Sequence, residues 1–148
     1  MIEWPAVLSI THLIGLALAV GSATVKLVLL LRCRAHPPFA ATFLEVSGPV
    51  TRLIILGMIL LSISGIGWLF LGYGLTARLA VKLALFASIW VLGPVIDKRI
   101  EPRLRNLAPR PGDAPTPAYA GALRGYLVWE TVATALFYVI VLIWMIPF

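Results

Sequence analysis

The first long apolar run constrains this chain more than any other feature of its sequence. It extends from Pro5 to Leu31 and is long enough to cross a bilayer, yet it contains a histidine and a lysine. At about 100° per residue, these two residues share one helical stripe with small residues, while Leu and Val fill most of the remaining circumference. The stripe consists of His12, Gly15, Ala19, Ser22 and Lys26. Because polar groups that face lipid are costly, we expect this stripe to face other protein segments.

The composition places the whole chain in the membrane class. Of its 148 residues, 61% are hydrophobic and only 12% are charged, whereas charged residues make up about 25% of a soluble domain. Spans of about 20 residues are predicted at 5–31, 51–73, 77–96 and 123–146, so that four spans and their loops use nearly all of residues 1–148. The expected fold is a single, all-α, integral membrane four-helix bundle in the lipid bilayer.

Two longer connections, residues 32–50 and 97–122, separate these spans. In the first, a short interfacial helix is predicted to end at Gly48-Pro49, because this dipeptide is typical of a chain break. The second is charged and rich in proline, which predicts an extended, solvated loop with one helical turn around Ile100 to Leu107.

The second and third spans are joined by a short turn and are expected to form an antiparallel hairpin. Thr76 precedes the third span and is predicted to be its N-cap. A side of small residues on the second span is predicted to allow close approach of another helix. This thin side comprises Ser62, Gly65, Leu69 and Gly72.

The distribution of basic residues predicts the orientation. Arg78 alone lies beside the short turn, and no basic residue precedes Lys26. The connections 32–50 and 97–122 are bracketed or filled by Arg32, Arg34, Arg52, Lys98, Arg99, Arg103, Arg105, Arg110 and Arg124. By the positive-inside rule, both are cytoplasmic loops and both termini are outside, in a multi-pass protein of a bacterial-type inner (cytoplasmic) membrane. The net charge of +6 thereby indicates contact with anionic lipid rather than with nucleic acid.

This orientation assigns a depth to each ionisable group inside the spans. His12 lies about six residues outward of the centre of the first span, and Lys82 about five residues outward of the centre of the third, at about 1.5 Å per residue. Lys26 and Glu130 share the inner half in the same way. Ionisable groups in a bilayer usually face one another or a cavity, so both pairs are candidates for contact across the bundle.

Three interpretations of the inner pair stay open. Lys26 and Glu130 form a buried ion pair between the first and fourth spans, or Lys26 extends alone to the cytoplasmic head groups. In the third interpretation Glu130 carries protons, together with Thr134 and Tyr138 one and two turns further along the helix.

His12 also has three interpretations: a neutral imidazole hydrogen-bonded inside the bundle, a proton carrier, or an axial ligand to the metal of a tetrapyrrole such as haem b. A second axial ligand from this chain would be Met145, which lies at a compatible depth on the fourth span. Lys82 and Arg78, one turn apart, would neutralise carboxylates such as porphyrin propionates, or would extend outward to the head groups. No spacing of residues identifies a catalytic group.

Three stretches carry a resemblance to a known group. They are the first span as THLIGLALAVGSATVKLVLLLR, a second span that opens with Arg52 and closes in SGIG, and a third that reads ARLAVKLALFASIW. Together they resemble the small four-span proteins related to the CopD-type copper-resistance domain and the HemJ-type protoporphyrinogen oxidase. That group has a histidine near the outer end of span one and a lysine early in span three, where this chain has His12 and Lys82. The resemblance implies that both residues take part in haem binding and porphyrinogen oxidation.

Two classes of function follow. The first is a non-enzymatic accessory subunit of a larger membrane assembly for electron transfer or pigments, with protein partners or further copies of itself in the membrane and His12 as a tetrapyrrole ligand. The second is a haem-dependent, HemJ-type oxidoreductase that acts on porphyrinogen. Whether the chain is an enzyme stays open at this point.

Overall fold

The computed structural model describes residues 3–109 and 113–145, which are largely helical and contain no strand. The helices are α1 (Trp4–Ala35), α2 (Ala40–Phe70), α3 (Ala77–Val95), α4 (Glu101–Leu107) and α5 (Pro117–Met145). A 3₁₀ turn, η1 (Pro37–Phe39), joins α1 to α2, and a π-helix, η2 (Ile96–Ile100), joins α3 to α4. The predicted all-α four-helix bundle is confirmed.

Four helical rods are long and apolar enough to cross a membrane. They are α1, η1 with α2, the continuous rod from Ala77 to Leu107, and α5 as far as Ile143. The third rod has 31 residues, and at about 1.5 Å per residue it exceeds the roughly 30 Å of a hydrocarbon core. The chain is therefore a multi-pass membrane protein whose helices reach beyond the acyl region.

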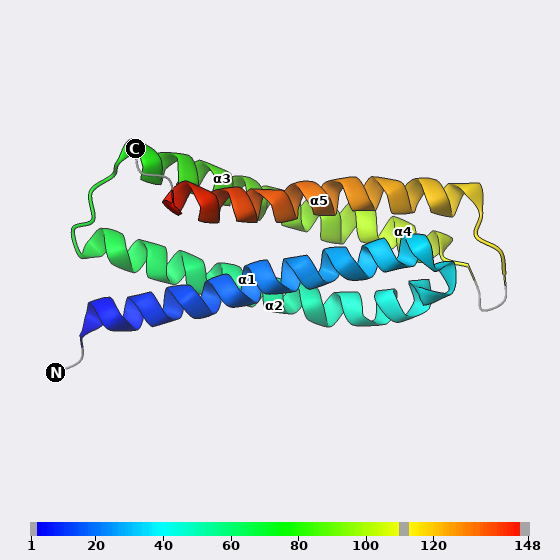
Figure 1. Ribbon diagram of the computed structural model, residues 1–148, viewed down its shortest axis with the longest axis horizontal. Helices are drawn as coiled ribbons and strands as arrows, with labels where there is room; N and C mark the ends of the chain where they lie inside the picture. The colour runs from blue at the N-terminus through cyan, green and yellow to red at the C-terminus, as the bar shows by residue number, and fades with distance from the viewer. Residues whose placement is uncertain (1–2, 110–112, 146–148) are drawn as a thin grey trace.

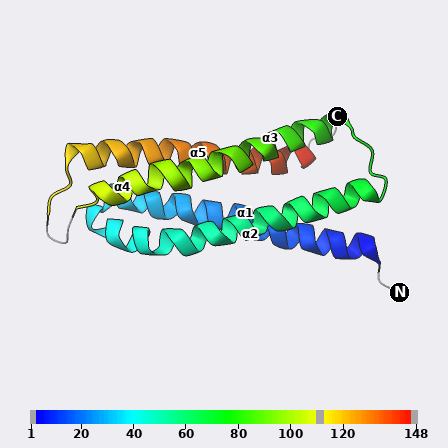
Figure 2. The same cartoon turned by 180° about the vertical axis from the view of Figure 1, so that it is seen from behind.

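The rods form two layers, shown from opposite sides in Figures 1 and 2. One layer is the antiparallel pair of α1 and α2, and the other contains α5 and the rod of α3, η2 and α4. α5 contacts both α1 and α3, so it links the two layers. The N- and C-terminal ends lie at the same end of the bundle, as an even number of spans requires. We call this the terminal end and the opposite one the loop end.

Glycines set the close crossing of α1 and α2. A Cβ atom at Gly57 would lie 2.7 Å from the Gly15 carbonyl oxygen and would also collide with the backbone of Ala19. Gly15, Ala19 and Lys26 are buried, which confirms that the polar and small stripe of α1 faces protein at these positions. His12, at the outer end of the same stripe, is exposed.

The face that α2 buries differs from the predicted thin side. Its buried positions in this region are Gly57, Met58, Leu61 and Ser64, whereas a Cβ atom at Gly65 would meet no atom within 4 Å. Small residues permit close approach of a helix, but they do not decide which face of α2 is buried. The crossing with α1 decides this, because it leaves no room for a side chain at Gly57.

Prolines do not interrupt two of the helices. Pro49, at the predicted break, lies inside α2, so much of the segment 32–50 is helical. Gly93-Pro94 also suggests a break near the end of the third span, yet Pro94 lies inside α3 and the rod extends to Leu107. A break at membrane depth would leave several backbone groups without partners, whereas a proline removes only one donor. The predicted helical turn at Ile100 to Leu107 is confirmed as α4, which is joined to α3 by the π-helix.

Two threonines begin the later helices. The Thr76 Oγ1 atom accepts a hydrogen bond from the Leu79 amide at 3.2 Å, which confirms the predicted N-cap of α3. Thr116 Oγ1 accepts from the Tyr119 amide at the same distance, 3.2 Å. α5 therefore begins at Pro117, before the predicted start of the fourth span, because a threonine followed by proline is a favourable helix start.

The apolar core is concentrated at the loop end and the middle of the bundle. The loop-end cluster contains Leu30, Cys33, Ala40, Phe43, Ile96, Leu104, Tyr119, Leu123, Tyr126, Leu127 and Ala133. The middle cluster contains Ala19, Ala23, Met58, Leu61, Ile89 and Phe137. Ile89 is the one buried residue of α3, and toward the terminal end the two layers diverge in both views (Figures 1 and 2).

Candidate functional site

His12, the central candidate of the terminal end, is fixed by a serine of the neighbouring helix. Its Nδ1 atom lies 2.9 Å from Ser64 Oγ, and the Ser64 hydroxyl lies 3.1 Å from the Leu61 carbonyl oxygen. When the single hydroxyl proton of Ser64 points to the Leu61 carbonyl, its Oγ atom accepts from Nδ1 of His12. That tautomer of the imidazole leaves the lone pair of Nε2 available.

The burial of the two partners is very unequal. Ser64 is completely buried, whereas the ring of His12 belongs to an exposed residue on the outer part of α1. Imidazole in contact with acyl chains is unfavourable. His12 is thus anchored on one side by Ser64 and exposed on the other.

Lys82 and Arg78 occupy the same end, on the first turns of α3. Lys82 is close enough to His12 to interact with it electrostatically, as their shared predicted depth requires. Arg78, one turn earlier, interacts electrostatically with Lys82. Both cations have additional interactions of their own. The terminal end thus holds an imidazole with positive charge beside it.

Two further residues could supply a ligand atom, Met145 and His36. The backbone of Met145 ends α5, and its side chain lies outside the described residues. His36 caps the other end of α1 and is exposed at the loop end. Within residues 3–109 and 113–145, no three His, Cys, Asp or Glu side chains gather in a way that would hold a metal ion.

A second polar cluster lies near the loop end, around a buried lysine. Lys26 Nζ donates to Thr51 Oγ1 at 2.7 Å and forms an ion pair with Glu101 Oε2 at 3.3 Å. Lys26 and Glu101 are both buried. The ammonium group also lies 5.6 Å from the centre of the Tyr126 ring, within the range of a cation–π contact. The charge is thus compensated on several sides.

Glu101 is the centre of this cluster. Its Oε2 atom accepts from Ser47 Oγ and from the Tyr126 hydroxyl, each at 2.7 Å, in addition to Lys26. Arg105 Nη2 lies 3.4 Å from Oε1 and 3.2 Å from the Leu44 carbonyl oxygen. One carboxylate therefore connects α1, α2, α4 and α5. We call this set (Lys26, Ser47, Thr51, Glu101, Arg105 and Tyr126) the Glu101 cluster.

The predicted pairing of Lys26 with Glu130 is wrong, since the ion-pair partner of Lys26 is Glu101. Glu130 is buried near by and interacts electrostatically with Lys26 and Glu101. The expected relay is also not continuous: the Thr134 hydroxyl is buried without a partner among the described residues, and the Tyr138 hydroxyl lies 2.9 Å from Thr24 on α1.

Sequence reasoning missed Glu101 because it stands among charged residues and directly before a proline, in DKRIEPRLRN. Charged residues beside a proline are typical of a solvated loop. One feature could have identified it: Ile96, Ile100 and Leu104 recur every four residues and indicate a helix with a buried side through the charged stretch. Glu101 follows Ile100 and belongs near that side.

Comparison of the chain with protein-family models, with curated proteins and with solved structures finds no match.

Proposed function

We propose that this chain is an accessory subunit of a larger membrane assembly for electron transfer or pigments, and that it holds a tetrapyrrole such as haem b through His12. The observation that carries the proposal is the 2.9 Å hydrogen bond between His12 Nδ1 and Ser64 Oγ, which anchors the ring by one nitrogen. With the Ser64 proton directed to Leu61, Nε2 keeps its lone pair, which is the form of histidine that ligates a metal.

The other residues of the terminal end fit such a guest. Lys82, in electrostatic contact with His12, and Arg78 supply positive charge where the carboxylates of a porphyrin would lie. A bound tetrapyrrole would supply one-electron chemistry, and the chain would supply the ligand, its orientation and the surrounding charge. His36 is at the opposite end of α1, so a second axial ligand would come from Met145 or from a partner protein.

The accessory role is inferred from the shape of the chain. Nearly all of the described residues belong to four membrane-length rods, so the surface that this chain offers to other molecules lies largely within the bilayer. His12 is exposed at an end where the two helical layers diverge. A neighbouring membrane protein, or a second copy of this chain, would cover that polar surface.

Absorption spectroscopy tests the haem proposal directly. We expect the protein purified in mild detergent, or reconstituted with haemin, to show a Soret band that His12→Ala abolishes. The matched control is His36→Ala, which removes the other histidine of the chain and should leave the band unchanged. The proposal would be overturned if the unsubstituted protein is colourless and does not take up haemin, although circular dichroism shows that it is folded.

A HemJ-type oxidoreductase is the second candidate, favoured by the electrostatic contact of Lys82 with His12. In that case the haem-loaded protein oxidises protoporphyrinogen in the presence of an electron acceptor. Lys82→Met should then abolish turnover and leave the Soret band in place. Full haem loading without any turnover would exclude the oxidoreductase, and only the accessory role would remain.

The orientation and the membrane belong to the same proposal: a bacterial-type inner membrane, with the loop end in the cytoplasm. Single cysteines at Asp113 and at Tyr73, in a Cys33→Ser background, test it in whole cells. Both positions are exposed and belong to opposite ends of the bundle. A membrane-impermeant maleimide should label the cysteine at 73 only, and the reverse pattern would overturn the orientation.

A further inference from the structure

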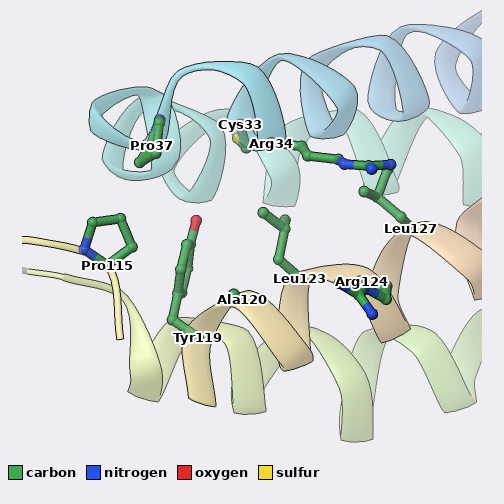
Figure 3. Close-up of a pocket in the computed structure, with 9 residues that line it drawn as sticks. All are labelled: Cys33, Arg34, Pro37, Pro115, Tyr119, Ala120, Leu123, Arg124 and Leu127. Atoms are coloured by element: carbon green, nitrogen blue, oxygen red, sulfur yellow. The ribbon is translucent and has the colours of Figure 1, made fainter. Parts of the chain in front are cut away.

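A cavity of about 160 Å³ lies at the loop end, between the last turns of α1 and the first turns of α5. Figure 3 shows the side chains that line it. They are Cys33, Arg34, Pro37, Pro115, Tyr119, Ala120, Leu123, Arg124 and Leu127. None of these residues belongs to the His12 site or to the Glu101 cluster, so the cavity has no role in the function proposed above.

Tyr119 is the first indication that the cavity has a ligand. The residue is only 2% exposed, and its hydroxyl has no hydrogen-bond partner among the described residues. Figure 3 shows its ring rising from α5 toward the end of α1, with the oxygen on the side of Cys33 and Pro37. A buried hydroxyl without a partner is unfavourable, and an orphan of this kind calls for a missing acceptor.

Charge is the second indication. Arg34 comes from α1 and Arg124 from α5, and both line the same cavity. Neither forms a hydrogen bond or an ion pair with the residues that the structure describes, in contrast to Arg105, which is paired with Glu101. The lining contains no carboxylate. Two guanidinium groups and a phenol hydroxyl are all donors, which together favour an anion.

The apolar part of the lining distinguishes a lipid from a small soluble anion. Leu123, Leu127 and Pro37 line the cavity beside the two arginines, as a phosphate group with attached acyl chains requires. The cavity also lies where α1 ends, which is the depth of the head groups in a membrane-length bundle. We propose that it binds the phosphodiester head group of an anionic phospholipid, with Arg34 and Arg124 on the phosphate. The Tyr119 hydroxyl lies on the other side of Leu123 from the two guanidinium groups (Figure 3), and we assign it to the remainder of the head group.

The test is native mass spectrometry of the full chain in detergent, titrated with phosphatidylglycerol or with phosphatidylcholine. Phosphatidylglycerol should bind more tightly, and Arg34→Gln with Arg124→Gln should weaken it about tenfold. Tyr119→Phe should weaken it about threefold to fivefold. Arg103→Gln is the matched control, because Arg103 is an exposed arginine at the same end outside the cavity, and it should leave the affinity unchanged.

Three results would overturn the proposal. Equal binding of the two lipids would exclude recognition of the anionic head group. Loss of binding in Arg103→Gln to the same extent would indicate diffuse surface attraction, and complete competition by millimolar inorganic phosphate would indicate a site for a free anion. Thermal unfolding of each variant without added lipid shows that it is folded, and Tyr119→Phe keeps the test valid if the double arginine variant is not.

Discussion

The loop end and the terminal end of the bundle both contain polar side chains, but these differ in burial and in the number of their hydrogen bonds. At the loop end, Glu101 is buried and accepts from donors on four helices, and an apolar cluster surrounds it. At the terminal end, His12 makes one hydrogen bond to Ser64 and is otherwise exposed. The two ends therefore differ in how they satisfy their polar groups: the first pairs them between helices, and the second leaves an imidazole exposed.

This difference shows where a membrane bundle obtains its cohesion. Lipid is as apolar as the helix surfaces, so burial of leucine gives little drive to associate, and close packing and hydrogen bonds between helices decide instead. The Glu101 cluster and the Gly57 crossing provide both. We therefore expect the largest losses of stability for changes in the Glu101 cluster and at the Gly57 crossing.

The largest effect is expected for Glu101→Gln. Loss of this carboxylate leaves Lys26 buried without its counter-charge, which costs about 3–5 kcal/mol. Unfolding by SDS in mixed micelles, followed by circular dichroism, measures the loss. Glu45→Gln is the matched control, since Glu45 is exposed on α2, and it should change the free energy of unfolding by less than about 0.5 kcal/mol.

A double variant shows whether this loss belongs to the ion pair. Lys26→Met combined with Glu101→Gln removes both charges, so it should be more stable than the sum of the two single losses predicts, by about 1–3 kcal/mol. If the losses simply add, the stability of the loop end does not depend on the pair.

The next largest effect is expected for Gly57→Ala, because the new methyl group would collide with α1 at Gly15 and Ala19. Forcing the helices apart should cost about 1–3 kcal/mol. Gly65→Ala on the same helix meets no atom within 4 Å and should not destabilise. Equal losses in the two variants of α2 would mean that the crossing is not closely packed in the membrane.

The smallest effect on stability is expected at the terminal end. Ser64→Ala removes the hydrogen bond that holds His12 and should lower the free energy of unfolding by about 1 kcal/mol or less, in the same SDS assay. In haem-loaded protein, the same variant should shift or broaden the Soret band, because the ring loses its orientation. A loss as large as that of Glu101→Gln would remove the distinction between the two ends.

Several features followed from local sequence. Four apolar stretches predicted four membrane-length helices, and the stripe of α1 predicted the burial of Gly15, Ala19 and Lys26. The N-cap of α3 at Thr76 could also be predicted from the adjacent residues alone. These predictions succeed because hydropathy and helical period are properties of a single segment, and the bilayer enforces both.

Other features depended on contacts between segments. The partner of Lys26 is Glu101 rather than Glu130, because the helix continues through Pro94 and the π-helix and carries Glu101 into the bundle. The buried face of α2 is set by the crossing at Gly57, and the exposure of His12 by the divergence of the layers. The recurrence of Ile96, Ile100 and Leu104 indicates a helix through the charged stretch, but no local pattern says which residue of another helix Glu101 meets.

The sequence by itself determined that this protein is an all-α membrane bundle, since apolar length and the cost of unpaired backbone in lipid leave few other structures. The tertiary structure alone decided which charges meet. Packing of α5 against α1, and of α4 against α5, brings Glu101 to Lys26, whereas His12 stays exposed. The physical reason is that an ion pair depends on distance in space, and residues 26 and 101 become neighbours only when four helices have packed together.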